Sequence, residues 1–246
     1  MPRSYVAEAR RRGLGRRRDR IGLVVERLAA EHADAEIALR FRSDLELLVS
    51  VMLSAQTTDV NVNRVTPALF DKYRSPEDYL AVPVEELERD IHATGFFRQK
   101  TKSIQGASRR IVEGFGGRVP QTMDELISLP GVARKTANVV LGTAFGKNEG
   151  VVVDTHVGRL ATRLSLTHSS KNEKDAVKIE EDLMEVLPRK DWTFAAHTLI
   201  WHGRRVCIAR KPRCDACVVS RYCPSAGMFN GPPAATEKKP VRPRKS

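Results

Sequence analysis

The chain of 246 residues carries 42 lysines and arginines against 30 acidic residues, which gives a formal net charge of +12. A chain of this length can bury a core without cross-links, and no apolar stretch approaches the length of a membrane span. No apolar run of signal-peptide length follows the N-terminal arginines, so we expect neither a membrane protein nor a secreted one.

Most of the positive charge lies at the two ends of the chain. Residues 1–20 contain eight arginines and carry a net charge of +6, and residues 225–246 carry +4 and contain four prolines. By subtraction, about +2 remains for residues 21–224. Such polar segments cannot bury enough surface to order themselves. We therefore expect residues 1–20 to be a disordered basic arm and residues 225–246 a disordered, proline-rich basic tail, which either aid solubility or attract phosphate.

Between these ends, the hydrophobic pattern is helical almost throughout. Ser43 precedes a stripe of apolar residues at helical spacing, and Ser75-Pro76 and Thr122 are typical residues for a helix N-terminus. A cluster of glycines at 114, 116 and 117 is expected to end the helix before it. The only run typical of a strand, residues 151–153, is too short to build a sheet. These features predict an all-α fold.

Residues 129–137 contain a Pro130-Gly131 turn between two predicted helices. Such a hairpin directs backbone N–H groups and the positive end of the second helix outward, where they can bind an anion. DNA phosphate is the candidate anion because the ends of the chain and its cysteine-rich segment are basic. Most hairpins only join packed helices, so the turn by itself is weak evidence.

Two residues near this hairpin are candidates for catalysis. Lys135 falls in the first turn of the second helix, where the positive helix end and Arg134 are unfavourable for a cation. A nucleophilic lysine needs the neutral amine, although most lysines are simply solvated. Asp154 follows the apolar run and precedes another helical face. It is either the N-cap of that helix or a carboxylate that acts as a charge partner or base in a cleft.

All four cysteines of the chain lie within 17 residues, at Cys207, Cys214, Cys217 and Cys223. Four close thiols, with none elsewhere, indicate one metal centre. A structural zinc site usually pairs two close-spaced knuckles, and here only Cys214 and Cys217 form one. The wider arms favour an iron–sulfur cluster over zinc without excluding zinc. Disulfides would need an oxidising compartment.

These motifs together resemble the endonuclease III family of helix-hairpin-helix DNA glycosylases. The hairpin at 129–137, the Val-Asp-Thr-His stretch at 153–156, the cysteine spacing and residues 53–59 match in the family's order, from about residue 21 to Cys223. The resemblance implies a two-lobed fold with a catalytic cleft between a helical barrel, residues 37–149, and an iron–sulfur lobe, residues 150–224. A helix at residues 21–36 would pack on the second lobe. The four cysteines would hold one 4Fe–4S cluster.

The resemblance also implies a bifunctional DNA glycosylase and abasic-site lyase of base excision repair. Lys135 would attack the sugar C1′, expel the base and form a Schiff base, and β-elimination would cut the strand 3′ to the lesion. Asp154 would help to deprotonate Lys135 and stabilise the cationic sugar. The expected substrate is double-stranded DNA that contains oxidised pyrimidines or abasic sites, bound by a monomer in the cytoplasm at the nucleoid.

The DNA contacts implied by the resemblance involve three regions. Gln56 would fill the gap that a flipped nucleotide leaves. Phe96 falls where the family has a leucine wedge, and its alternative is an ordinary core aromatic. Phosphates would meet the hairpin and the cysteine loop through Gly131, Val132, Ala133, Arg134, Arg210, Lys211 and Arg213. Ala133 stands where the family often has glycine, so we expect a negative φ there.

Two other functions stay open. A monofunctional glycosylase of the same fold would release a base without cutting the strand, but such relatives lack a lysine at position 135 and add a C-terminal domain. A non-catalytic DNA-binding module braced by metal would bind DNA in a salt-dependent manner without cleavage.

Overall fold

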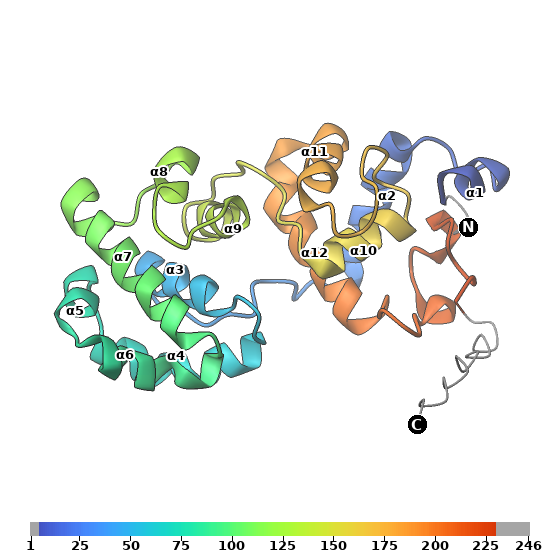
Figure 1. Cartoon of the computed structure of the whole chain (residues 1–246). Helices are drawn as coiled ribbons and strands as arrows, with labels where there is room; N and C mark the ends of the chain where they lie inside the picture. Colours follow the sequence, from blue (N-terminus) through green and yellow to red (C-terminus); the bar gives the residue numbers. More distant parts are fainter. Residues whose placement is uncertain (1–4, 230–246) are drawn as a thin grey trace, which may run out of the picture.

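The computed structural model describes residues 5–229, which form helices joined by turns and loops without any β-strand. Figure 1 shows two groups of helices side by side. The first lobe consists of α3 (Asp44–Leu53), α4 (Asp59–Lys72), α5 (Pro76–Ala81), α6 (Val84–Ile91), η1 (His92–Thr94), α7 (Phe97–Phe115), α8 (Met123–Ile127) and α9 (Arg134–Ala144). The second consists of α1 (Tyr5–Arg11), α2 (Arg17–Glu31), α10 (Thr155–Arg163), α11 (Ala176–Val186), η2 (Arg189–Asp191), α12 (Trp192–Arg205), η3 (Cys214–Ala216) and η4 (Ser220–Tyr222). The predicted all-α class is confirmed.

The helix starts of the first lobe follow local capping signals. The hydroxyl of Ser43 accepts the Glu46 amide at the start of α3. Ser75 and Asp78 form a reciprocal capping box at α5, and Thr122 caps α8. Gly116, with a φ of 58°, ends α7, whereas Gly114 lies inside that helix. Residues 151–153 are buried and do not form a strand, as expected.

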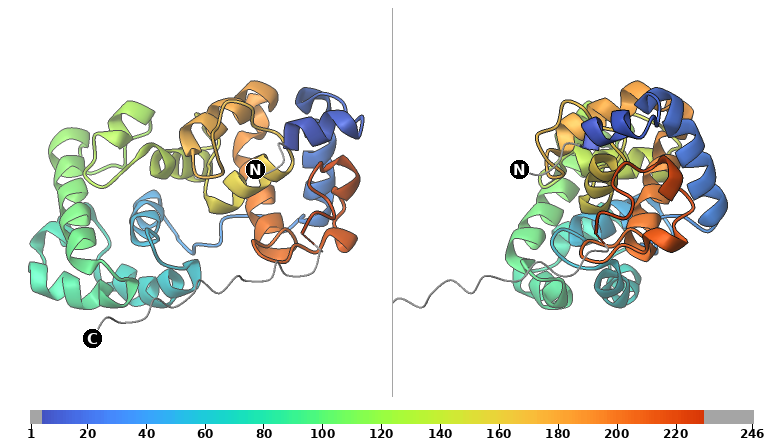
Figure 2. Two further views of the ribbon diagram at one scale, coloured as in Figure 1. Left: turned by 45° about the vertical axis from the view of Figure 1, so that its right-hand side comes forward. Right: turned by 90° about the vertical axis from the view of Figure 1, so that its right-hand side faces the viewer.

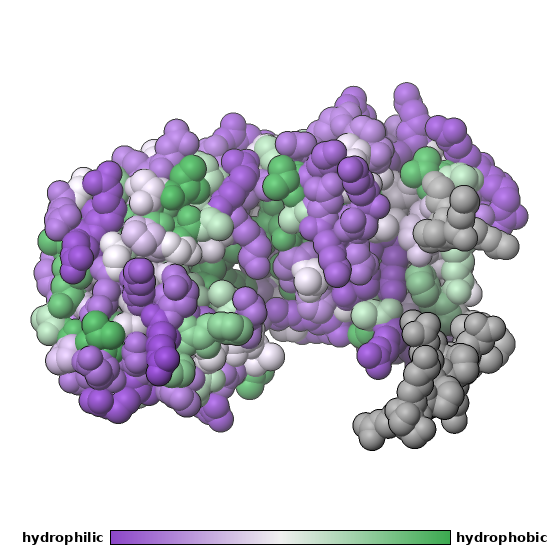
Figure 3. Space-filling model, in the orientation of Figure 1, coloured by the Kyte–Doolittle hydropathy of each residue, from purple (hydrophilic) through white to green (hydrophobic). Residues whose placement is uncertain are grey.

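Each lobe has its own hydrophobic core. Leu47 and Ile111 are fully buried in the first core, and Val24 and Leu199 are fully buried in the second. Val139 of α9 packs against both cores and so joins the lobes. Figure 3 shows a mainly hydrophilic surface that is hollowed between the two lobes. The fold therefore places residues from two independently packed bodies around one space.

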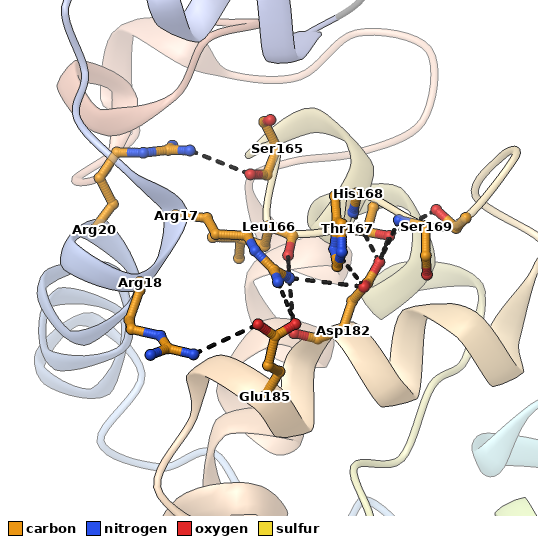
Figure 4. A network of polar contacts seen from close by, with 11 residues as sticks. Arg17, Arg18, Arg20, Ser165, Leu166, Thr167, His168, Ser169, Asp182 and Glu185 are labelled. Carbon is orange, nitrogen blue, oxygen red and sulfur yellow. Dashed lines mark hydrogen bonds and ion pairs between the residues drawn. The ribbon is translucent and has the colours of Figure 1, made fainter.

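The prediction that residues 1–20 form a disordered arm is wrong for residues 5–20, because this segment contains α1 and the start of α2. Arg20 is 4% exposed and donates hydrogen bonds to the carbonyls of Leu164, Ser165 and Tyr222. Arg17 pairs with Asp182 and Glu185 of α11 (Figure 4). From composition alone, these arginines are expected to be solvated. In the structure, their planar guanidinium groups bind oxygen atoms of the second lobe.

The N-terminal helices also lie beside the cysteine-bearing segment, as both views in Figure 2 show. A guanidinium N–H of Arg12 donates to the carbonyl of Cys223 over 2.6 Å. Of the predicted C-terminal tail, residues 230–246 lie outside the described residues, while Ser225 is 2% exposed. Among the described residues, no helix is both long and apolar enough to cross a bilayer.

Candidate functional site

The two predicted catalytic residues come together between the lobes. Lys135 lies in the first turn of α9 in the first lobe, and Asp154 is the N-cap of α10 in the second. Both line the same two adjoining cavities. Lys135 is exposed and Asp154 is half-buried. An amine and a carboxylate from opposite walls therefore face a space that a substrate can enter.

The two carboxylate oxygens of Asp154 lie in different environments, because only one of them accepts hydrogen bonds from the described part of the chain. Its Oδ1 accepts hydrogen bonds from the amides of His156 and Val157, each over 2.8 Å. Its Oδ2 has no hydrogen-bond partner among residues 5–229. The cap orients the carboxylate and leaves Oδ2 able to accept a proton, so the two alternative roles of Asp154 are compatible.

The hairpin that presents Lys135 depends on a glycine. Gly131 has a φ of +79°, and a Cβ atom at this position would lie 2.6 Å from the Cβ of Ser103. Only glycine combines this backbone with such a close approach. Ala133 has a φ of −92°, the negative value that we expected, and α9 begins directly after it. These two residues fix where α9 starts and hence where Lys135 lies.

The backbone amides of the hairpin are not equivalent. The Val132 amide donates to the Leu129 carbonyl over 3.1 Å, so this one of the three amides predicted to bind phosphate already has a partner within the hairpin. The amides of Gly131 and Ala133 have no hydrogen-bond partner in the described part of the chain. The guanidinium of Arg134 is 49% exposed and donates to Glu180 over 3.2 Å. It can contact DNA only with its remaining N–H groups.

Gln56 and Phe96 lie on two exposed loops with unusual backbone conformations. Their φ values are 56° and 48°, in the left-handed region that non-glycine residues rarely adopt. The Phe96 side chain is 63% exposed, so the alternative of a core aromatic is wrong. Strained, exposed residues of this kind concentrate at functional sites.

The cavity is also lined by residues that were not among the predicted site residues, and three of them are Asp59, Arg204 and Lys174. Asp59 of α4 and Arg204 of α12 form an ion pair of 2.6 Å that connects the two lobes beside Lys135. Lys174 is a second amine on the cavity wall. No sequence pattern could assign these roles, because the three residues lie in different segments that only the fold brings together.

The four cysteines line one cavity of the second lobe, and none of them forms a disulfide. Four thiols around one cavity are the soft donor set that an iron–sulfur cluster uses. Burial raises the pKa of Cys217 to about 11, which favours the neutral thiol until a cation binds beside it.

Basic side chains from other helices support this metal centre. Arg163 of α10 donates to the Sγ atom of Cys207 over 3.3 Å. The Nε2 atom of His202 lies 3.4 Å from the Sγ atom of Cys217, and His32 contacts the other side of that ring. Such contacts stabilise thiolate ligands, and no sequence pattern indicates them. Arg210, Lys211 and Arg213 are exposed on the loop, although Arg213 also donates to the Arg205 carbonyl.

Two family models match the chain. Residues 49–189 match the HhH-GPD superfamily of base excision DNA repair proteins, and residues 207–223 match the iron–sulfur binding domain of endonuclease III. Endonuclease III of Synechocystis sp. is 53% identical over 78% of this chain and 86% of its own length. Endonuclease III of Escherichia coli K12 is 39% identical over 81% of this chain and 92% of its own length.

Solved structures agree with these matches. A trapped covalent intermediate of endonuclease III with DNA superimposes with a TM-score of 0.79 at 41% identity, covering 84% of this chain and 95% of that chain. A non-covalent endonuclease III–DNA complex gives a TM-score of 0.78 at 42% identity, covering 84% of this chain and 94% of that chain. A thermostable thymine-DNA glycosylase, 23% identical with a TM-score of 0.72 over 83% of this chain and 95% of that chain, shares the fold.

Proposed function

We propose that Lys135 and Asp154 are the catalytic pair of this chain, which belongs to the endonuclease III family of base excision repair DNA glycosylases and abasic-site lyases. The observation that carries the proposal is that both side chains line the same cavity from opposite lobes. A bifunctional reaction needs an amine nucleophile and a group that accepts its proton within one space. Lys135 and Asp154 supply these two groups.

In this reaction, the Nζ atom of Lys135 attacks C1′ of the damaged nucleotide, and the glycosidic bond breaks so that the base leaves with the bonding electrons. Asp154 accepts a proton from the amine and stabilises positive charge on the sugar. Opening of the sugar ring gives a Schiff base between C1′ and Nζ. Loss of a proton from C2′ then expels the phosphate at C3′, which cuts the strand on the 3′ side.

The surrounding residues would bind the duplex and expose the target nucleotide. The target must leave the base stack to reach the cavity, and Gln56, which lines the cavity, and the exposed Phe96 would enter the vacated space. The amides of Gly131 and Ala133 remain available for phosphate. The protein binds an iron–sulfur cluster, which we assign to the four cysteines and which braces the loop that carries Arg210, Lys211 and Arg213.

We extend the proposal to substrate and location. Oxidised pyrimidines and abasic sites in duplex DNA are the substrates that the family resemblance implies. The protein would act on them as a monomer in the cytoplasm, associated with the nucleoid.

Strand cleavage of lesion-containing duplexes tests this function. The wild-type protein should cut duplexes with an abasic site or an oxidised pyrimidine, and Lys135→Ala should reduce cutting by at least about 100-fold. Lys174→Ala, which removes the other amine on the cavity wall, is the matched control and should retain cutting. Base release without cutting would indicate a monofunctional glycosylase, and binding without either would indicate a non-catalytic module. Undiminished cutting by Lys135→Ala would show that the nucleophile is another residue.

A further inference from the structure

The two residues proposed to enter the DNA stack lie on loops that are separate in the sequence. Gln56 lies between the end of α3 at Leu53 and the start of α4 at Asp59. Phe96 follows η1 and precedes α7. Both residues are exposed and have positive φ values, which non-glycine backbone adopts only when its surroundings hold it there. Something in the structure must therefore hold both loops.

Lys100 of α7 makes the first connection between these loops. Its side chain is buried, with 6% exposure, and its ammonium donates to the Leu53 carbonyl over 2.7 Å and to the Thr94 carbonyl over 2.8 Å. A buried ammonium is costly unless its donors are satisfied. The Leu53 carbonyl lies at the C-terminus of α3, where the helix dipole favours a cation. Lys100 thus joins the start of the Gln56 loop to η1, directly before the Phe96 loop.

Asn61 of α4 makes a second, independent connection. Its side-chain amide donates to the Thr57 hydroxyl over 3.0 Å and to the Ala93 carbonyl over 2.5 Å. Thr57 follows Gln56 directly in the sequence, and Ala93 is part of η1. The two loops are therefore linked on both sides of Gln56, once from α7 and once from α4.

We propose that Lys100 and Asn61 are positioning residues that clamp the two loops and set the spacing at which Gln56 and Phe96 enter damaged DNA. The inference rests on the proposed function, because it needs both residues to enter the base stack. Neither Lys100 nor Asn61 touches DNA or reacting atoms in this role. Their contribution is preorganisation: loops held in the bound conformation lose less freedom when DNA binds, and a small misplacement of an inserted side chain weakens binding strongly.

The ratio of two dissociation constants separates positioning from general DNA affinity. The probes are a duplex with a stable abasic-site analogue and the same duplex without damage. Asn61→Ala and Lys100→Met should each lower the preference for the damaged duplex by about tenfold or more, while the affinity for the undamaged duplex stays within about twofold of wild type. Asn63→Ala is the matched control, because Asn63 lies on the same helix and bonds instead to Ala38 and Arg40.

A double-mutant comparison shows whether the clamp acts through the inserted residues. In a protein that already carries Gln56→Ala and Phe96→Ala, Asn61→Ala should lower the preference no further, because residues in one network are not additive. The same measurement applies to Lys100→Met, and Asn61→Ala alone decides if Lys100→Met does not fold.

Two results would overturn the clamp: an unchanged preference in Asn61→Ala, or an equal additional loss in the background that lacks both inserted side chains. Failure of the proposed function would give another result, in the wild-type protein and not only in the variants. If wild-type protein binds both duplexes equally, the lesion-recognition role fails and the clamp fails with it.

Discussion

At the scale of single residues, Asp154 combines a structural and a proposed catalytic role in one carboxylate. Asparagine keeps the acceptor oxygen that caps α10 but removes the charge, whereas alanine removes both. Asp154→Asn should therefore keep nearly wild-type stability and lose at least about 100-fold in cleavage rate. Asp154→Ala should lose the same activity and, in addition, about 1 kcal/mol in the free energy of unfolding.

Urea unfolding and single-turnover cleavage, measured on the same two preparations, check this separation. Wild-type cleavage by Asp154→Asn would show that the charge has no part in the reaction. A stability loss of equal size in both variants would show instead that the amide cannot replace the cap.

Gly131 provides a second test at the residue scale, because it combines a left-handed backbone with a close neighbour. Gly131→Ala should strain the backbone and also push against Ser103, at a combined cost of about 2–4 kcal/mol in the free energy of unfolding. Gly116 is the matched control. Its φ is also positive, at 58°, but a Cβ atom there has nothing within 4 Å.

Gly116→Ala should therefore lower the free energy of unfolding only through backbone strain, by about 1–2 kcal/mol. Urea denaturation of both variants gives the difference between them. Equal losses would mean that Ser103 moves aside at no cost and that the hairpin is less tightly packed than its contacts indicate.

At the scale of elements, α2 is attached to α11 through Asp182, which is 3% exposed. Burial opposes ionisation of this carboxyl, but hydrogen bonds from the Thr167 hydroxyl and the amides of Ser169 and His168 together hold its pKa below its usual value of 3.8. Arg17 of α2 adds an ion pair. Because the folded-state pKa lies below the unfolded-state pKa, the ionised carboxylate stabilises the fold above about pH 4. That stabilisation disappears as the pH falls through the lowered pKa.

Asp182→Asn should accordingly cost about 1–3 kcal/mol in the free energy of unfolding at neutral pH, and the cost should shrink as the pH falls below about 4. Glu181→Gln removes one exposed charge from the same helix and should follow the wild-type pH profile. Urea denaturation at a series of pH values checks both. A cost for Asp182→Asn that does not change with pH would contradict the role assigned to its ionised form.

Elements whose signals are local could be predicted from the sequence, and elements held by distant partners could not. Three helix starts could be predicted from their N-cap residues, because a cap and the amide that it accepts lie within three residues of each other. These caps are Ser43, Ser75 and Thr122. The ordered structure of residues 5–20 could not be predicted because its partners are remote: Arg20 donates to the carbonyl of Leu164, 144 residues away. Amino-acid composition does not indicate which residues so far apart in the sequence will pair.

The same distinction applies to the candidate site. Lys135 and Asp154 each lie in a short motif at the start of a helix. Both could therefore be predicted as site residues from the sequence. Lys100 bridges two loops, and no pattern around it shows which carbonyls it will meet. The ring contact of His202 with Cys217 is equally non-local.

At the scale of the whole molecule, the positive charge should determine how affinity for DNA depends on salt. Arg210 and Lys211 are exposed on the loop of the metal centre, and each contact with a phosphate contributes about −0.9 to the slope of log K against log salt. The double variant Arg210→Ala/Lys211→Ala should therefore flatten the slope by about 2. Ile208→Ala changes an uncharged, exposed residue of the same loop and should leave the slope unchanged. Binding to undamaged duplex at several salt concentrations measures both, and an unaltered slope in the double variant would place the loop away from DNA.

The fold brings two amines, Lys135 and Lys174, to the cavity, so an experiment must identify which of them reacts. Borohydride reduction during reaction with abasic DNA should fix the Schiff base as a stable adduct, and peptide mapping by mass spectrometry then locates it. The modified peptide should carry the sugar on Lys135, and Lys135→Ala should give no adduct, while Lys174→Ala should give the wild-type yield. An adduct on Lys174, or an undiminished yield from Lys135→Ala, would contradict the assignment of Lys135 as the nucleophile.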